Sequence, residues 1–327
     1  MESEIDAFRQ DHLVHIIHLK IYFPIKGSVF FSKRYVRAVD DVTFSIEKNK
    51  ITGLMGESGC GKTTIGRAIV MLERPTEGKI IFEGKDIWKL NKTELKNFRR
   101  SVQMIFQDPF ASLNPLQTVF GNLSLPLSVH GLSKKSEMRE LCARTLEEVK
   151  LSPEYLDKYP HQLSGGERQR VCIARAMILK PRFIIADEPT SMIDASIKGE
   201  ICKLLIELKN KYNLTLLLIS HDLSIIRGLS DVIVTMYLGK VVEILSSKKY
   251  TEFLHPYSQL LAYASDFSIE DEKLPLKGDV PSAINPPSGC RFHPRCIIAT
   301  EKCKKEVPSL KEVNPGHYVA CFLYDRR

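Results

Sequence analysis

Short apolar runs, each ending at polar or glycine-rich positions, divide the chain into elements. Residues 42–46 alternate between apolar and polar side chains, as in a half-buried strand, and the apolar run 51–55 leads into a glycine-rich turn. Two further runs, 183–186 and 214–219, are each followed by a helix-compatible segment. Because fully apolar strands joined by helical segments are typical of buried parallel sheets, the pattern predicts an α/β fold.

A different pattern covers residues 111–180. Strand signals fade there, and the charged stretch 139–150 carries Leu141, Leu146 and Val149 on one side, as an amphipathic helix does. We expect these residues to form a helical subdomain that is inserted into the α/β core.

The pattern changes again after Leu245. Apolar periodicity breaks, and proline and glycine become frequent between residues 281 and 289. We therefore expect a small separate appendage at residues 247–327, beside an α/β core formed by residues 1–110 and 181–246.

The composition fits a folded protein and sets limits on its surroundings. The 327 residues are 43% hydrophobic and 26% charged, and the longest uncharged apolar runs are far shorter than the ~18 residues that cross a bilayer. The acidic start, residues 1–6, lacks the positive flank and apolar core of a secretory signal, so we expect a cytoplasmic protein. Basic and acidic residues are mixed throughout, so the net charge of +8 indicates a solvated surface rather than a nucleic-acid site.

A glycine-rich loop follows the apolar run 51–55. Residues 56–63 read Gly-Glu-Ser-Gly-Cys-Gly-Lys-Thr and match the phosphate-loop pattern G-x-x-x-x-G-K-[ST], between a predicted strand and a predicted helix. Glycines let successive backbone N–H groups and the helix N-terminus surround phosphate oxygens. Lys62 can reach the β- and γ-phosphates, and the Thr63 hydroxyl can help to hold Mg²⁺.

Two carboxylates follow the apolar run 183–186. In α/β proteins the carboxyl ends of the strands form the ligand site, so we expect Asp187 to bind Mg²⁺, directly or through water. Glu188 is the candidate general base for the attacking water. A strand that ends in Asp-Glu is commonplace, but together with a phosphate loop it indicates catalysis.

The segment 163–169, Leu-Ser-Gly-Gly-Glu-Arg-Gln, is a second candidate phosphate-binding surface. It precedes a helix-compatible run from 170 to 179, so Ser164 can cap that helix and the amides of Gly165 and Gly166 stand open at its positive end. One chain cannot easily present two such surfaces to one γ-phosphate. We therefore expect a partner chain to supply the signature segment that closes over this phosphate loop.

These motifs follow one another as they do in the ABC ATPase family, which the chain resembles over nearly its whole length. The resemblance implies a P-loop (RecA-like) ATPase core that works as a dimer on two membrane-spanning permease subunits. It also implies that Gln107 senses the γ-phosphate, Mg²⁺ and the membrane subunit, that Asp194 lies in a loop crossing to the partner ATPase, and that His221 contacts the γ-phosphate.

The resemblance thus gives a full set of expected site residues. The catalytic residues are Glu188, His221 and Gln107, and Mg²⁺ is held through Thr63, Gln107 and Asp187. The ATP-binding residues of the loop and helix are Gly56, Glu57, Ser58, Gly59, Cys60, Gly61, Lys62, Thr63 and Thr64. The signature that acts in trans consists of Ser164, Gly165, Gly166 and Glu167.

An aromatic residue upstream of the first core strand stacks on adenine in this family. Tyr22-Phe23-Pro24 resembles the family's aromatic-proline form, so Phe23 is the first candidate and Tyr35 the alternative. Simple core packing of Phe23 is equally compatible with the sequence.

Further features resemble the dipeptide and oligopeptide importer branch of the family. Residues 106–115 are similar to its extended glutamine loop, residues 255–261 to its His-Pro-Tyr segment, and Gly66-Arg67 to the second of the two ATPases that such importers pair. The resemblance implies an ATPase that energises peptide import at the cytoplasmic face of the membrane, with a non-identical partner ATPase and, indirectly, an extracytoplasmic solute-binding protein.

Other functions stay open at this point. Importers of oligosaccharides, nickel chelates or opines use similar ATPases. A non-transport ABC ATPase acting on nucleic acid is disfavoured, because no coiled coil or zinc-bearing insertion separates Lys62 from Ser164. A purely regulatory module predicts the loss of Glu188 or His221, and both are present.

Four of the eight cysteines crowd into the last 38 residues. In a reduced compartment a metal or cluster site is a better explanation for Cys290, Cys296, Cys303 and Cys321 than disulfides are. Four thiolates suit a [4Fe-4S] cluster, and their wide spacing disfavours Cys₄ zinc, which remains the alternative. Reduced cysteines that only pack the tail are a third possibility. The segment also resembles the cysteine-bearing tail of peptide-importer ATPases, some of which are associated with such a cluster.

Overall fold

The computed structural model describes residues 11–25, 34–132, 134–265 and 279–325, so the acidic start of the chain lies outside the described residues. The chain divides into two compact units. The first comprises Met1–Glu47, Ile51–Trp88 and Ser220–Arg327, and the second Lys48–Lys50 and Lys89–Ile219. The expected division into core, helical subdomain and appendage stays a prediction.

The first unit contains an antiparallel sheet. Its strands are β1 (His12–Pro24), β2 (Tyr35–Glu47), β4 (Glu77–Phe82) and β5 (Lys85–Asp86), in the order β2-β1-β4-β5. In β2, Val42, Phe44 and Ile46 are at most 5% exposed, which confirms the predicted alternation. Ile16 of β1 lies opposite Phe44, and Leu19 opposite Val42. Since directly opposite residues share a face, β1 and β2 bury a common apolar surface.

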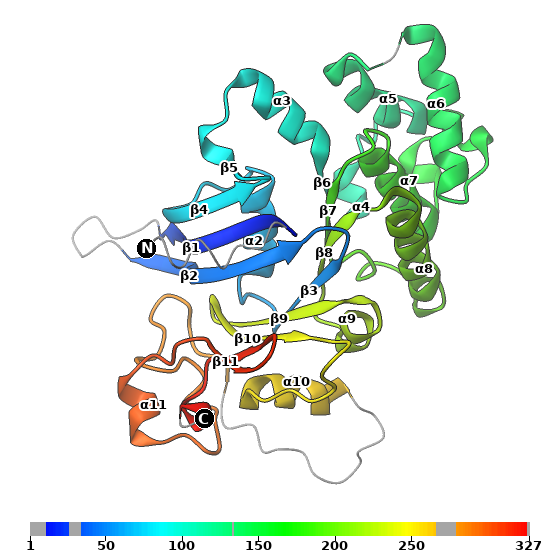
Figure 1. Ribbon diagram of the computed structural model, residues 1–327. Coiled ribbons are helices and arrows are strands. Elements are labelled where there is room, and N and C mark those ends of the chain that lie inside the picture. The colour runs from blue at the N-terminus through cyan, green and yellow to red at the C-terminus, as the bar shows by residue number, and fades with distance from the viewer. Residues whose placement is uncertain (1–10, 26–33, 133, 266–278, 326–327) are drawn as a thin grey trace. The chain divides into compact units, whose positions relative to one another are not determined.

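The other strands of this unit pair side by side in a second sheet (Figure 1). β3 (Ile51–Met55) pairs in parallel with β9 (Val232–Tyr237), and β10 (Lys240–Ser246), β12 (His317–Val319) and β11 (Lys311–Asn314) continue the sheet in antiparallel order. Every residue of β3 is buried, as its apolar run predicts. The described helical segments are α2 (Lys62–Ile69), η1 (Ile87–Lys89), α9 (Leu223–Leu229), α10 (Pro256–Ser265), α11 (Glu301–Lys305) and η4 (Phe322–Tyr324).

The chain beyond Leu245 contains regular structure that its sequence pattern did not predict. β12 extends the sheet at β10, with Glu243 opposite Val319, and Ala320 N–H donates to Val242 O at 2.9 Å. Tyr257 and Phe292 are buried in one cluster with β9 and β10 residues. The tail therefore belongs to the same compact unit as the phosphate loop.

The second unit combines parallel strands with helices. β6 (Val102–Ile105) pairs with β7 (Phe183–Asp187), and β7 pairs with β8 (Thr215–Ile219). Its described helices are α3 (Lys92–Ser101), α4 (Pro109–Ser112), α5 (Val119–His130), α6 (Lys135–Glu148), α7 (Gly165–Met177) and α8 (Ala195–Tyr212), with short 3₁₀ turns η2 (Pro153–Asp157) and η3 (Pro160–Gln162). The fully buried β7 and β8 confirm the two apolar runs as parallel strands.

The helical character predicted for residues 111–180 is confirmed. In this region Leu146 and Val149 are fully buried, at the end of α6 and just after it. α7 begins at Gly165, directly after its predicted cap Ser164, so the signature glycines form its first turn ahead of the helix-compatible run 170–179. Within the described ranges, no helix is long and apolar enough to cross a membrane.

Candidate nucleotide-binding site

The phosphate loop joins β3 to α2 in a conformation that only glycine tolerates. Gly56, Gly59 and Gly61 have φ values of 148°, 78° and 107°. A Cβ at Gly56 would lie 2.2 Å from Met236 O, and one at Gly61 2.2 Å from Ala38 O. Backbone strain and lack of space both require glycine at these two positions, whereas the approach of the loop amides to phosphate stays a prediction.

Lys62 lies inside this loop. It is buried, and its Nζ donates to Gly56 O at 2.7 Å and to Glu57 O at 3.1 Å. Burial raises the pKa of the neighbouring Cys60 thiol, which keeps that sulfur neutral beside the ammonium. Two carbonyls of the loop thus hold the Lys62 ammonium inside it. Ser58 and Gly59 are exposed, and Thr63 and Thr64 are half-buried at the start of α2.

Three further predicted residues belong to this unit. His221 is exposed and directly precedes Asp222, whose carboxylate caps α9 by accepting from Ser224 N at 3.0 Å. Phe23 is a half-buried residue of β1. Tyr35 begins β2 and is 38% exposed. Contact of any of these with nucleotide stays a prediction.

The second unit holds Asp187, the predicted Mg²⁺ residue, and Glu188, the predicted general base. Asp187 ends β7 and is 2% exposed, whereas Glu188 is half-buried and has a left-handed φ of 48°. Glu188 N–H donates to Ile219 O at 2.9 Å, and the Ser191 hydroxyl donates to Glu188 O at 3.0 Å. These backbone contacts fix the position from which the Glu188 side chain projects.

The signature segment caps α7 as its sequence predicts. Ser164 Oγ accepts from Glu167 N at 3.3 Å, and Glu167 Oε2 accepts from Ser164 N at 2.8 Å, which completes a reciprocal capping box. Tyr155 donates its hydroxyl proton to Glu167, and this hydrogen bond is the largest of the causes that lower the pKa of that carboxyl. Ser164 is exposed at the positive end of the helix.

The remaining predicted residues of this unit lie on loops. Gln107 is exposed after β6, just before Asp108, whose carboxylate caps α4. Asp194 is exposed directly before α8. A Cβ added at Gly165 would lie 3.7 Å from Met192 O, so the signature and the loop that contains Asp194 are neighbours.

Sequence reasoning missed two residues that contact the phosphate loop. Arg295 donates from Nη1 to Glu57 Oε2 at 2.9 Å and from Nη2 to Glu57 Oε1 at 3.2 Å. Glu57 N–H donates to Tyr257 Oη at 2.7 Å. The sequence marked Tyr257 and Arg295 only as parts of family segments, and no local pattern connects them with residue 57.

The four C-terminal cysteines line one cavity of ≈ 200 Å³. Burial raises the pKa of the Cys290 and Cys321 thiols to about 11, and it also raises the pKa of Cys296. A charge on Cys303 raises the pKa of each of the other three, so the four thiols are within electrostatic reach of one another. Among the residues that the structure describes, no three His, Cys, Asp or Glu side chains are placed to hold a metal ion.

Two family models match the chain. Residues 39–191, which include the phosphate loop, the signature and Asp187, match the family described as "ABC transporter". Residues 242–303, which include Tyr257 and Arg295, match "Oligopeptide/dipeptide transporter, C-terminal region". The two matches support both the nucleotide site and the importer features of the sequence.

Known proteins resemble the chain over most of its length. The oligopeptide transport ATP-binding protein AppF of Bacillus subtilis is 45% identical over 326 residues, which cover 97% of this chain and 99% of that protein. The dipeptide transport ATP-binding protein DppF of Haemophilus influenzae is 39% identical over 318 residues, covering 96% and 97%. A solved dimer of the ATP-binding cassette MJ0796, bound to ADP and Pi in a post-hydrolysis state, matches with a TM-score of 0.64 and 29% identity over 72% of this chain and 99% of that chain.

Proposed function

Because the chain belongs to the ATP-binding proteins of ABC transporters, in their oligopeptide and dipeptide branch, we propose that it hydrolyses ATP to energise the import of oligopeptides or related small solutes. The observation that carries this proposal is the presence in one chain of a phosphate loop, a capped signature helix and the C-terminal region matched at residues 242–303. The first two features supply the ATPase, and the third indicates the class of cargo.

In this proposal each site residue has a defined task. Lys62 and the amides of the phosphate loop bind the phosphates, and Thr63 and Asp187 hold Mg²⁺ together with Gln107. Glu188 takes a proton from the attacking water as general base, and His221 contacts the γ-phosphate. Phe23 stacks on adenine, with Tyr35 as the alternative.

The proposed function also requires partner subunits. The Ser164–Glu167 signature acts on the phosphate loop of a second, non-identical ATPase, and the loop at Asp194 reaches across to it. Two permease subunits bind the ATPase pair at the cytoplasmic face of the membrane, and an extracytoplasmic solute-binding protein selects the cargo. The mixed surface charge gives no reason to expect a nucleic-acid partner.

Reconstitution of the complex in liposomes tests which solute is imported. We expect the complex with its permeases and partner ATPase to take up labelled oligopeptides in the presence of MgATP, and the Lys62→Ala variant to lose this uptake. If the complex takes up oligosaccharides or nickel chelates but no peptides, it imports a different solute, one of those carried by related importers. ATPase activity that depends on DNA and not on permeases would overturn the transport proposal.

We further propose that the cysteine-lined cavity holds one [4Fe-4S] cluster in a structural role. Four thiols of the right chemistry surround one cavity, and a cluster, being larger than a single ion, does not require the sulfurs to converge on one point. Zinc is the alternative and needs such convergence at ≈ 2.3 Å. The bound iron would stabilise the thiolates of Cys290, Cys296, Cys303 and Cys321 against the cost of their burial.

Anaerobic purification with iron and sulfide analysis decides the cluster question. We expect stoichiometric iron and sulfide, a brown chromophore, and loss of that chromophore in Cys296→Ser with MgATP binding retained. Cys202→Ser, which changes a cysteine in α8, is the matched control and should keep the colour. Colourless protein with stoichiometric zinc, or with no metal, would contradict the proposal.

A further inference from the structure

Glu57 is held in the phosphate loop by the side chains of three different residues. Its N–H donates to Tyr257 Oη at 2.7 Å, its carbonyl accepts from Lys62 Nζ at 3.1 Å, and its carboxylate accepts both ends of the Arg295 guanidinium at 2.9 and 3.2 Å. Each polar group of this residue therefore has a defined direction. Glu57 is thus an anchored point of the phosphate loop, tied to residues far from it in the sequence.

Both C-terminal partners are themselves firmly placed. Tyr257 belongs to the first turn of α10 and is fully buried, and Arg295 is 5% exposed in the segment between Cys290 and Cys296. A bidentate bond from arginine to a carboxylate fixes the orientation of both groups, which a single point charge does not. Burial opposes the charge of Arg295, but its hydrogen bonds to Glu57 and Tyr237 raise its pKa above the ordinary value.

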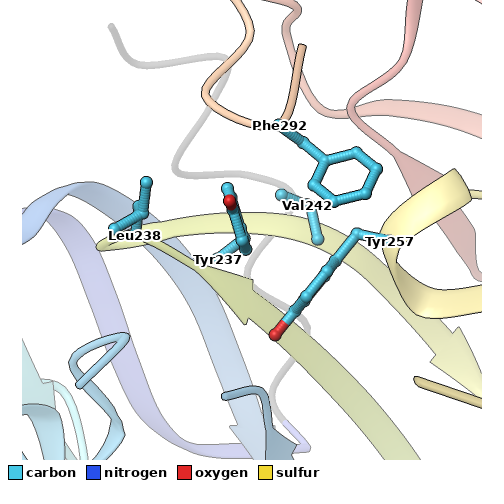
Figure 2. Close-up of a cluster of buried hydrophobic side chains, with 5 residues drawn as sticks. All are labelled: Tyr237, Leu238, Val242, Tyr257 and Phe292. Atoms are coloured by element: carbon cyan, nitrogen blue, oxygen red, sulfur yellow. The ribbon is translucent and has the colours of Figure 1, made fainter. Parts of the chain in front are cut away.

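An aromatic cluster supports these contacts (Figure 2). The ring centroids of Tyr237 and Tyr257 are 4.6 Å apart, and Phe292 meets Tyr237 edge-on at 5.2 Å. The Arg295 guanidinium lies 5.9 Å from the Tyr237 ring centroid and 6.0 Å from that of Phe292. Close-packed rings in a buried cluster restrict movement. The cluster therefore holds in place the backbone segments from which the Tyr257 and Arg295 side chains extend to the phosphate loop.

We propose that Arg295 and Tyr257 are positioning residues for ATP binding, which hold the phosphate loop through Glu57 in the shape that receives the phosphates. A loop that is already ordered loses less conformational entropy when the nucleotide binds, so the protein has a higher affinity for ATP. The inference rests on ATP binding by this family and not on the nature of the cargo. A negative peptide-uptake experiment would leave it intact.

Titration calorimetry of MgATP on the full-length chain tests the proposal. Arg295→Gln should raise the Kd about ten-fold, since a hydrogen bond to a charged group contributes enough to change an equilibrium constant by that factor. Arg295→Lys keeps the positive charge but cannot donate two parallel hydrogen bonds to the carboxylate. Its Kd for MgATP should therefore lie between those of the native chain and Arg295→Gln. Lys304→Ala is the control, because Lys304 is an exposed residue of the same region that pairs with Glu301.

Three further variants separate positioning from a general loss of structure. Glu57→Gln removes the ion pair from the loop side, and the double variant with Arg295→Gln should bind no more weakly than the weaker single one. Tyr257→Phe keeps the buried ring but removes the acceptor of the Glu57 N–H, so it should also raise the Kd. In the assembled complex, Arg295→Gln should raise KM for MgATP while kcat stays near its native value.

These measurements leave defined ways to overturn the proposal. The proposal is wrong if the Kd for MgATP of both Arg295→Gln and Glu57→Gln stays within about two-fold of the native value. A loss shared by Lys304→Ala, full additivity in the double variant, or a fall in kcat at unchanged KM would also contradict it. If Arg295→Gln does not fold, Glu57→Gln and Tyr257→Phe still decide the question.

Discussion

Glu188 has a backbone conformation that residues other than glycine rarely adopt. At φ 48° it lies in the left-handed region, where a non-glycine residue costs about 1–3 kcal/mol and persists only when its surroundings fix it. Its N–H bonds to Ile219 O, and its carbonyl accepts both from Ser191 N and from the Ser191 hydroxyl. These contacts hold the backbone of Glu188 in one conformation, which suits the role of general base that we propose for it.

Replacing the carboxylate alone tests that role. Glu188→Gln should bind MgATP with native affinity but, in the assembled complex, turn it over at least ~100-fold more slowly, because the amide cannot take the proton from water. Steady-state ATPase and nucleotide titration measure the two effects separately. Glu207→Gln, which alters a surface carboxylate paired with Lys150, is the control. Hydrolysis by Glu188→Gln at a near-native rate would show that the base is another group.

Residues of the site could be predicted from sequence where a motif is contiguous. The phosphate loop and Glu188 directly follow β3 and β7, strands that their apolar runs identify, so the positions of these motifs in the fold could be predicted from local sequence. The partners of Glu57 escaped prediction because Arg295 is 238 residues away along the chain. Only the tertiary packing of the tail brings the two side chains together.

At the scale of elements, the quality of prediction depended on how local the stabilising contacts are. The cap of α7 lies within four consecutive residues, Ser164–Glu167, and was predicted correctly. β11 and β12 are short, and most residues of β11 are exposed, so they lack the alternation that marks a strand. They form because β10 offers an edge to which β12 can pair, which a single sequence does not reveal.

The junction between β10 and α10 is held by a buried polar network. Glu243, which is fully buried, accepts from Leu254 N at 2.7 Å and from His255 N at 3.2 Å, and it pairs with His317 Nε2 at 2.7 Å. His255 Nδ1 accepts from Tyr257 N at 3.1 Å. This imidazole is thus required as a neutral acceptor, and burial lowers its pKa to about 3.

This lowered pKa predicts acid sensitivity of the fold. Between the ordinary histidine pKa of about 6.5 and the folded value of about 3, the unfolded chain binds a proton that the folded chain does not. The free energy of unfolding should therefore fall as the pH falls through this range, by up to ~1.4 kcal/mol per pH unit from this group.

Denaturant titrations at several pH values between 6.5 and 4.5 measure this slope. His255→Asn keeps an acceptor for Tyr257 N–H but has no titratable ring, so its unfolding free energy should fall less steeply. Carboxylates titrate in both proteins and cancel in the comparison. Equal slopes for the native chain and His255→Asn would show that His255 does not remain neutral in the fold.

At the scale of the whole molecule, the chain carries one phosphate loop and one signature, in different compact units. Ser164 is exposed at the N-terminus of α7, where backbone amides and the helix dipole favour an anion. A solved relative of the cassette, MJ0796, is described as dimeric. In the proposed function, the γ-phosphate is bound between the loop of one chain and the signature of another.

A substitution in the signature should accordingly act in trans. Ser164→Arg places a long cationic side chain at the exposed helix end, so hydrolysis at the partner's phosphate loop should fall about 100-fold, the usual effect of losing a transition-state donor. MgATP binding by the substituted chain itself should not change, because its own loop is intact. Ser152→Arg, at another exposed capping serine of the same unit, controls for the loss of a helix cap. Single-turnover hydrolysis, with one subunit of the pair unable to hydrolyse, separates the two sites, and full ATPase activity from a demonstrably monomeric preparation would contradict the composite site.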